Sequence, residues 1–334
     1  MVEISFNHKL AAHCESGTVS RLLNHAGIEL SEAMVFGISG SIFFGYFNTP
    51  MTRFPTIAVR NQPGKIRSNL AKYLGIKFQL SRFRDSEKAS RKLGDLLDRR
   101  IPVAVQVDFF YMDYIPAFAR AHFNGHFIVV VDKNTNNYII SDAYSPQLVE
   151  LDKETLQTAR FVKGPFAPKG LMFHLPEVRE GVNLEKAIQK GIKHAAFYML
   201  RVPIPFLGVR GIRYFARKLF DWPKYARDSE HLSHEIMMLN VLLEERGTGG
   251  GGFRFLYATF LREASEVMNE PALAEVAERM MQNGDQWRMI SLFAARMGRK
   301  RDLGRERLTE LSEMILNRAA VEKSLFTDLM KIVK

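Results

Sequence analysis

The hydrophobic positions in the first part of the chain indicate helices separated by short strands. After Cys14, the apolar residues 19, 22, 23 and 26 recur at the period of an amphipathic helix, and Gly27 is suited to end it. Residues 40–60 are aromatic and are punctuated by glycine and proline, which indicates strand and loop. The patterns predict further helices over Glu32–Gly37, Ser68–Leu74 and Ser86–Arg99.

Three apolar, β-branched runs that follow predict strands over Pro102–Val107, His126–Asp132 and Tyr138–Ala143. The last two are separated by a polar, asparagine-rich loop and therefore predict a β-hairpin. Folding this hairpin about Asn134 places His126 directly opposite Asp142, with the two side chains about 4.5–5.5 Å apart. A register slip of one residue would break this pairing.

The segment Lys163–Pro176 contains three prolines and two glycines and is the predicted domain boundary. Beyond it the pattern is helical, with helices expected over 184–199, 235–245, 253–268, 271–282, 286–297 and 305–332. The glycine run Gly247–Gly252 interrupts these helices, either as a flexible connector or as a loop that covers substrate. We therefore predict an α+β fold with a first domain over residues 1–170 and a helical domain over 177–334.

The composition is that of a globular protein. Of 334 residues, 46% are hydrophobic and 25% are charged, which is enough to bury a core without covalent cross-links. A single cysteine excludes an internal disulfide and fits a reducing compartment. The first ten residues lack the apolar run of a signal peptide, and no stretch approaches the roughly 20 apolar residues of a membrane span. These features predict a cytoplasmic protein with no stable membrane association.

The net charge of +11 favours an acidic partner or substrate. Nucleic acid is one such partner, but no nucleic-acid-binding motif is visible, and an acidic carrier protein is another. His231 and His234, with Glu230 and Glu235, have a spacing that would suit a metal. Because no third convincing ligand accompanies them, we predict no metal site.

Cys14 directly precedes the first predicted helix, in the run His13-Cys14-Glu15-Ser16. The positive end of a helix dipole stabilises a thiolate, and a neighbouring imidazole does the same by forming an ion pair. The carboxylate of Asp142 could hold one ring proton of His126 and direct the other nitrogen toward the thiol. We therefore predict Cys14, His126 and Asp142 as catalytic residues. The alternatives are a buried structural cysteine and a polar pair that closes a hairpin end.

The order of these residues resembles the papain-like fold, and in particular the bacteriocin-processing peptidases. In that group a glutamine six residues before the cysteine helps to form the oxyanion hole. His8 occupies this position here and could donate from a ring N–H. A closer resemblance is to the BtrH-like acyltransferase family of butirosin biosynthesis. The segments that carry it are His13-Cys14-Glu15-Ser16, Leu30-Ser31-Glu32, Phe36-Gly37, Gly125-His126-Phe127 and Ser141-Asp142, and in the helical half 247–250, 253–254 and 257–261.

The resemblance implies transfer of an acyl group from a phosphopantetheine thioester on an acyl carrier protein to a small-molecule amine. Cys14 would form the acyl-enzyme, and His126 would take a proton from the amine. The thioester arm is a substrate, so no cofactor is expected. His13 could tune the thiol or cap the helix. Arg254 could bind a substrate phosphate or carboxylate or form a salt bridge.

Two other functions are compatible with the same residues. The first is a cysteine hydrolase, either a thioesterase or a peptidase, in which water replaces the amine. The second is a non-catalytic binding module on a papain-like scaffold, which predicts that Cys14 is buried and unreactive.

Overall fold

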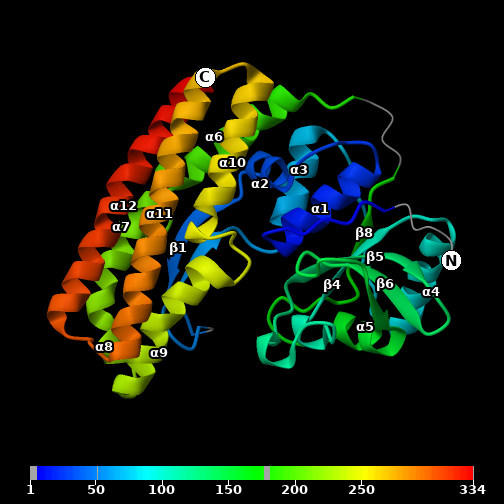
Figure 1. Cartoon of the computed structure of the whole chain (residues 1–334), viewed down its shortest axis with the longest axis horizontal. Coiled ribbons are helices and arrows are strands. Elements are labelled where there is room, and N and C mark those ends of the chain that lie inside the picture. The colour runs from blue at the N-terminus through cyan, green and yellow to red at the C-terminus, as the bar shows by residue number, and fades with distance from the viewer. Residues whose placement is uncertain (1–5, 51, 177–180, 334) are drawn as a thin grey trace. The chain divides into compact units, whose positions relative to one another are not determined.

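The computed structural model describes residues 6–50, 52–176 and 181–333. The chain forms two compact units, and the first of them comprises residues 1–35 and 66–182. The second unit comprises residues 36–65 and 183–334 (Figure 1). The helix α2 (Glu32–Ile38) contains the point where the chain passes from the first unit to the second.

The first unit is built on an antiparallel sheet. In its described part, six strands lie in the order β3-β8-β4-β5-β6-β7. These strands are β3 (Gln79–Ser81), β4 (Val103–Val107), β5 (His126–Lys133), β6 (Asn137–Ser141), β7 (Val149–Asp152) and β8 (Met172–His174). The accompanying helices are α1 (Cys14–His25), α3 (Lys65–Leu74), α4 (Ser86–Asp98) and α5 (Lys153–Arg160).

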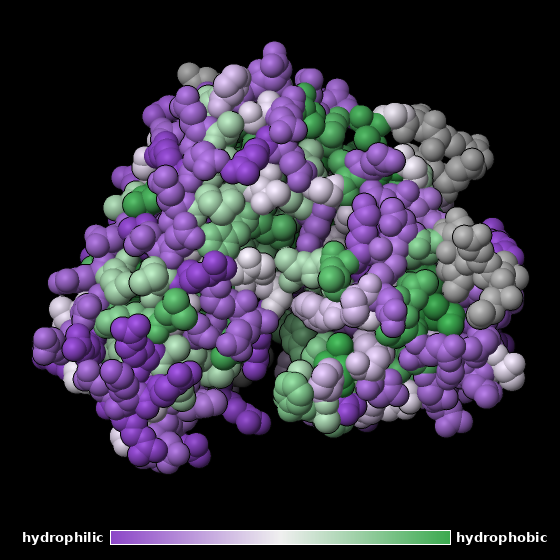
Figure 2. Space-filling model, viewed as in Figure 1, coloured by the Kyte–Doolittle hydropathy of each residue, from purple (hydrophilic) through white to green (hydrophobic). Residues whose placement is uncertain are grey.

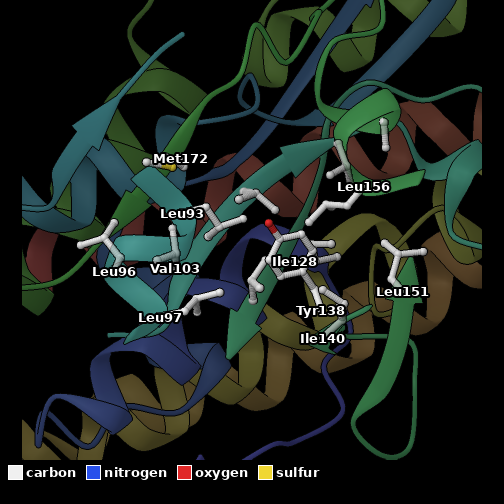
Figure 3. Packing of buried hydrophobic residues seen from close by; sticks show 14 of the residues in the cluster. Leu93, Leu96, Leu97, Val103, Ile128, Tyr138, Ile140, Leu151, Leu156 and Met172 are labelled. Carbon is white, nitrogen blue, oxygen red and sulfur yellow. The ribbon is translucent and has the colours of Figure 1, made fainter. Parts of the chain in front are cut away.

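Helices cover both faces of this sheet because its central strands are apolar on both sides. Ile128 and Val130 of β5 belong to a buried cluster with leucines of α4 and α5 (Figure 3). Successive side chains of a strand point to opposite faces. Phe127 therefore lies on the other face, where α1 packs against β5 and Thr18 donates a hydrogen bond to the Phe127 carbonyl. This packing brings the N-terminus of α1 to the end of β5 that begins with His126.

The second unit combines a β-hairpin with a helical bundle. The hairpin is β1 (Ile42–Phe47) and β2 (Thr56–Arg60). The main helices are α6 (Leu184–Leu200), α7 (Gly208–Lys218), α8 (Trp222–Tyr225), α9 (Ser229–Asn240), α10 (Arg254–Met268), α11 (Pro271–Lys300) and α12 (Arg305–Ile332). Phe44 of β1 packs between the rings of Phe215 and Trp287, so the hairpin is part of the bundle core.

The α+β class with a C-terminal helical region is confirmed, but the units differ from the predicted domains at two places. Residues 36–65, predicted within the first domain, belong to the second unit because β1 is buried against helices there. The predicted boundary segment Lys163–Pro176 contains β8, which pairs with β3 and β4 inside the first sheet. The units instead separate at residues 182 and 183. The short elements β3, β7, β8 and α5 were not predicted.

The glycine run before α10 is packed rather than open. Gly249, Gly250, Gly251 and Gly252 all have positive φ, which side-chain-bearing residues rarely adopt. A Cβ on Gly251 would meet the backbone of Gly284 at 3.0 Å. This close approach explains why glycine is required here, and it does not support a flexible connector.

No helix in the described ranges is long and apolar enough to cross a membrane. Among the same residues, no three or more His, Cys, Asp or Glu side chains are grouped so that they could hold a metal ion.

Candidate active site

Cys14 is the first residue of α1, and it is 3% exposed. His13 caps the helix, because its imidazole accepts a hydrogen bond from the backbone N–H of Ser16 at 3.3 Å. The Cys14 Sγ lies 3.9 Å from the carbonyl oxygen of Gly125, the residue before His126. The thiol therefore sits at the positive end of a helix and at the start of β5.

Glu32 fixes the backbone that leads into Cys14. Its carboxylate accepts hydrogen bonds from the N–H groups of Ala12 and His13, each at 2.8 Å, and from the hydroxyl of Ser16 at 2.8 Å. Burial raises the pKa of Glu32, although these bonds oppose the rise. From the sequence, Glu32 stands out only as the start of a short predicted helix and as part of the Leu30-Ser31-Glu32 segment of the family resemblance.

His126 and Asp142 are in contact, but not in the predicted register. The His126 Nε2 lies 2.8 Å from Asp142 Oδ2. In the sheet, Val129 pairs with Ser141 and Val130 with Ile140, which places Asp142 two residues from the position opposite His126. A shift of two residues preserves the face of the sheet, so the two side chains meet diagonally. The contact was thus predicted correctly, whereas the direct opposition was wrong.

The pair is arranged to keep His126 protonated. Burial alone lowers the pKa of His126, but the charge and hydrogen bond of Asp142, together with Cys14, raise it to about 10. Burial raises the pKa of Asp142, but His126 and the hydrogen bonds from His126, Tyr114 and the Tyr144 backbone outweigh it and lower the value. Because Nε2 is bound to Asp142, Nδ1 is the nitrogen left to interact with Cys14.

Aromatic rings hold the imidazole in place. The Tyr144 ring stacks on His126 with centroids 5.6 Å apart and planes 13° from parallel. The Phe109 ring contacts the same imidazole edge-on, with the ring centroids 4.9 Å apart. These contacts restrict rotation of the ring, as a residue that transfers protons requires.

Tyr114 is a further member of the site that the sequence did not reveal. Its hydroxyl donates to Asp142 Oδ2 at 2.7 Å, the same oxygen that faces His126. Burial, reinforced by the charge of Asp142, raises the pKa of Tyr114 well above its usual value. Tyr114 lies in the loop between β4 and β5, where no periodic pattern indicates which side chains turn inward.

We expect Tyr114→Phe to slow alkylation of Cys14 by iodoacetamide by roughly tenfold, because Asp142 loses a charge-assisted hydrogen bond that fixes its orientation. The measurement is the alkylation rate at neutral pH, followed by intact mass. Tyr111→Phe removes a hydroxyl from the same loop and serves as the control, with an unchanged rate expected. Equal rates for Tyr114→Phe and wild type would contradict a positioning role.

Arg21 is a second residue that was missed. It lies two turns after Cys14 on α1 and donates to the Lys9 carbonyl at 3.2 Å and to the Thr18 hydroxyl at 3.3 Å. Burial lowers the pKa of Arg21 to about 10, although Asp142, Glu32 and Cys14 oppose this effect. A buried cation in this position favours the ionised carboxylate of Asp142. Arg21 lies opposite the apolar stripe of the first predicted helix, where the pattern predicts a solvated charge.

Two predicted substrate contacts are not supported by the geometry. His8 Nε2 lies 2.9 Å from the Ser145 carbonyl and Nδ1 lies 2.7 Å from the Ser141 hydroxyl, so its ring N–H is directed at Ser145 and not at an oxyanion. Burial lowers the pKa of His8, which favours the neutral ring with a single N–H. His13 caps α1, which is the local role that the sequence left open.

Arg254, the third predicted substrate contact, belongs to the second unit and is fully buried. Its guanidinium forms a bidentate ion pair with Glu322, at 2.9 and 3.0 Å. Of the two roles that the sequence left open for Arg254, the structure shows the salt bridge, and the guanidinium does not present its charge to a ligand.

The first unit thus assembles a cysteine, an imidazole and a carboxylate in the order expected of a papain-like enzyme. The helix N-terminus, the protonated His126 and the buried Arg21 place positive charge around the Cys14 sulfur. A cysteine in this setting can attack an electrophilic carbonyl and hold the acyl group as a thioester.

Two family models match most of the chain between them. The family model described as Butirosin biosynthesis protein H, N-terminal, matches residues 13–143, and that of a domain of unknown function, DUF4872, matches residues 154–329. A solved structure from Bacillus anthracis, described as a C39-like peptidase, is similar with 12% identity and a TM-score of 0.35, covering 53% of this chain and 96% of its own. Comparison with curated proteins gives no match. The chain belongs to the DUF4872 family, and its first part is similar to the N-terminal part of butirosin biosynthesis protein H.

Proposed function

We propose that the protein is an acyltransferase that carries an acyl group on Cys14 from a thioester to an amine. The observation that supports this most strongly is the contact of His126 with both Asp142 and Cys14 at the N-terminus of α1. The matching family model is named after a protein of butirosin biosynthesis, which supports a role in biosynthesis rather than degradation.

The first half-reaction uses the ion pair of Cys14 and His126. The thiolate attacks the thioester carbonyl, the C–S bond to the donor breaks, and His126 gives its proton to the departing thiolate. This leaves a neutral imidazole beside an acyl-Cys14. The backbone N–H of Cys14, at the free end of α1, is the group best placed to stabilise the oxyanion, since His8 is engaged elsewhere.

In the second half-reaction an amine attacks acyl-Cys14 and the amide departs. His126 takes a proton from the attacking nitrogen, and Cys14 leaves as the thiolate that restores the ion pair. The donor is proposed to be a phosphopantetheine thioester on an acyl carrier protein. The net charge of +11 suits an acidic carrier of this kind.

The burial of Cys14 agrees with one expectation of the binding-module alternative, so chemical reactivity decides between them. The test is intact mass spectrometry after incubation with simple acyl thioesters, with Cys14→Ala alongside. Because the chain has one cysteine, a wild-type-only adduct identifies Cys14 without digestion. We expect this adduct to form and to be converted to an amide when amines are added.

Two outcomes would contradict the proposal. An adduct that decays only to free acid, whatever amine is present, would identify a hydrolase. No adduct, together with a native thiol inert to iodoacetamide, would identify a binding module.

A further inference from the structure

A second histidine–carboxylate pair lies in the loop between β4 and β5. Asp108 directly follows β4 and is fully buried. Its Oδ1 accepts hydrogen bonds from the backbone N–H groups of Phe110 at 3.1 Å and Phe123 at 2.9 Å, and its Oδ2 lies 2.7 Å from His122 Nδ1. The side chain of His122, by contrast, is 64% exposed.

These contacts fix the tautomer of His122. An ionised carboxylate only accepts hydrogen bonds, so the Nδ1 of His122 carries the proton that it shares with Asp108. This tautomer leaves a lone pair on Nε2, the ring nitrogen that Asp108 does not contact. The ring is also held in orientation, because it stacks on Phe110 with centroids 4.2 Å apart and planes 22° from parallel.

The pair lies close to the candidate active site along the backbone. Val107, the residue before Asp108, is the strand partner of His126 in the register of β4 and β5. Phe109, the residue after it, contacts the His126 ring edge-on. The segment also exposes apolar side chains, among them Phe118, and Figure 2 shows apolar surface where Figure 1 draws these residues in turquoise.

Amide formation from an ordinary amine needs more than one base. At neutral pH an alkyl amine is mostly protonated, and it must lose one proton before it attacks and a second as the amide forms. His126 accepts only one of the two. A base with a fixed tautomer, exposed beside the site, is suited to remove the other.

Resting on the acyltransferase function above, we propose that His122 is the base that deprotonates the acceptor ammonium, with Asp108 as its positioning residue. His122 Nε2 takes one proton from the ammonium, and the free amine attacks the carbonyl of acyl-Cys14. His126 takes the second proton as the C–N bond forms, and the C–S bond breaks to release the Cys14 thiolate. The net charge is conserved, because the two imidazolium ions and the thiolate together carry the single positive charge that the ammonium brought. His122 then returns its proton to water.

The experiment separates the half-reactions on the full chain at pH 7. Acyl-enzyme is formed with an acyl thioester, excess donor is removed, and the loss of acyl mass is timed after an amine is added. Two amines are compared: ethanolamine, which is mostly protonated, and methoxyamine, which is not. The variants are His122→Gln and, as the matched control, His231→Gln, which removes an imidazole paired with Glu235 on α9.

We expect His122→Gln to form acyl-enzyme at the wild-type rate, to slow transfer to ethanolamine roughly 10–100-fold, and to leave transfer to methoxyamine within about twofold. His231→Gln should match wild type throughout. Equal slowing with both amines, slower acyl-enzyme formation, or no slowing at all would each overturn the assignment of His122. A wild type that forms no acyl-enzyme would overturn the proposed function, and this inference with it.

Discussion

Replacing Asp142 with alanine should slow acylation of Cys14 by about 10²–10⁴-fold, the range over which positioned acid–base groups contribute. Without the carboxylate, His126 Nε2 loses its partner at 2.8 Å and Tyr114 loses its acceptor at 2.7 Å. The imidazole is then neither oriented nor held in its charged form. The measurement is the rate of acyl-enzyme formation with an acyl thioester, followed by intact mass.

Asp142→Asn separates the orientation of His126 from its charge. A carboxamide oxygen can still accept from His126 Nε2, so this variant should be more active than Asp142→Ala. It lacks the negative charge that, against the effect of burial, raises the pKa of His126 to about 10. The pKa of His126 is therefore lower in this variant than in wild type, and the imidazolium loses its proton at a lower pH. We expect the alkaline decline of the acylation rate to move to lower pH than in wild type.

The control for both substitutions is Asp98→Asn, since Asp98 is exposed and pairs with Lys133 at the surface. Its rate and pH profile should be those of wild type. Equal rates for Asp142→Ala and Asp142→Asn would show that the hydrogen bond to His126 does not matter. An alkaline decline at the same pH in Asp142→Asn and in wild type would show that the charge of Asp142 is not used.

Sequence reasoning found the three central residues because each is marked by a local pattern. Cys14 stands before an amphipathic helix, and His126 begins a continuous apolar strand. The hairpin calculation located Asp142 although its register was wrong by two residues, because an even shift returns every side chain to the same face. Nearer the turn Asp132 pairs with Ile139, a shift of three residues, and a bulge between Val130 and Asp132 reduces the shift to two. The hydrophobic pattern does not indicate this bulge.

The residues that were missed are defined by tertiary contacts. Tyr114 and Asp108 lie at irregular backbone, where no spacing tells which side chain turns toward the core. Arg21 looks like a solvated helix charge until the segment before Cys14 is seen to cover it. Similarly, β1 and β2 were recognised as strand and loop, but their packing partners in the bundle are more than a hundred residues away in the sequence.

Glu322 should be the most sensitive position of the second unit. It is fully buried and accepts hydrogen bonds from Arg254 at 2.9 and 3.0 Å, from Asn283 at 3.0 Å and from the Trp287 indole at 2.6 Å. Arg254 also donates to the carbonyl of Gly252 at 2.6 Å and lies over the Trp287 ring. One carboxylate thus holds together α10, α11, α12 and the end of the glycine run.

We expect Glu322→Ala to lower the free energy of unfolding by about 3–5 kcal/mol, because it leaves the Arg254 guanidinium buried without a counter-charge. The matched control is Glu278→Ala, which removes an exposed partner of Arg262 and should cost about 0–1 kcal/mol. Urea unfolding followed by tryptophan fluorescence is the measurement. Both tryptophans of the chain, Trp222 and Trp287, belong to the second unit, so the signal reports that unit alone.

A double variant tests whether the loss comes from the unpaired charge. Arg254→Met with Glu322→Met removes both charges at similar volume, and it should be more stable than Glu322→Ala, because no ion is left buried. It should remain less stable than wild type, since the donors of Asn283 and Trp287 then lack an acceptor, as they also do in Glu322→Ala. A double variant no more stable than Glu322→Ala would locate the loss in those two donors and not in the charge of Arg254.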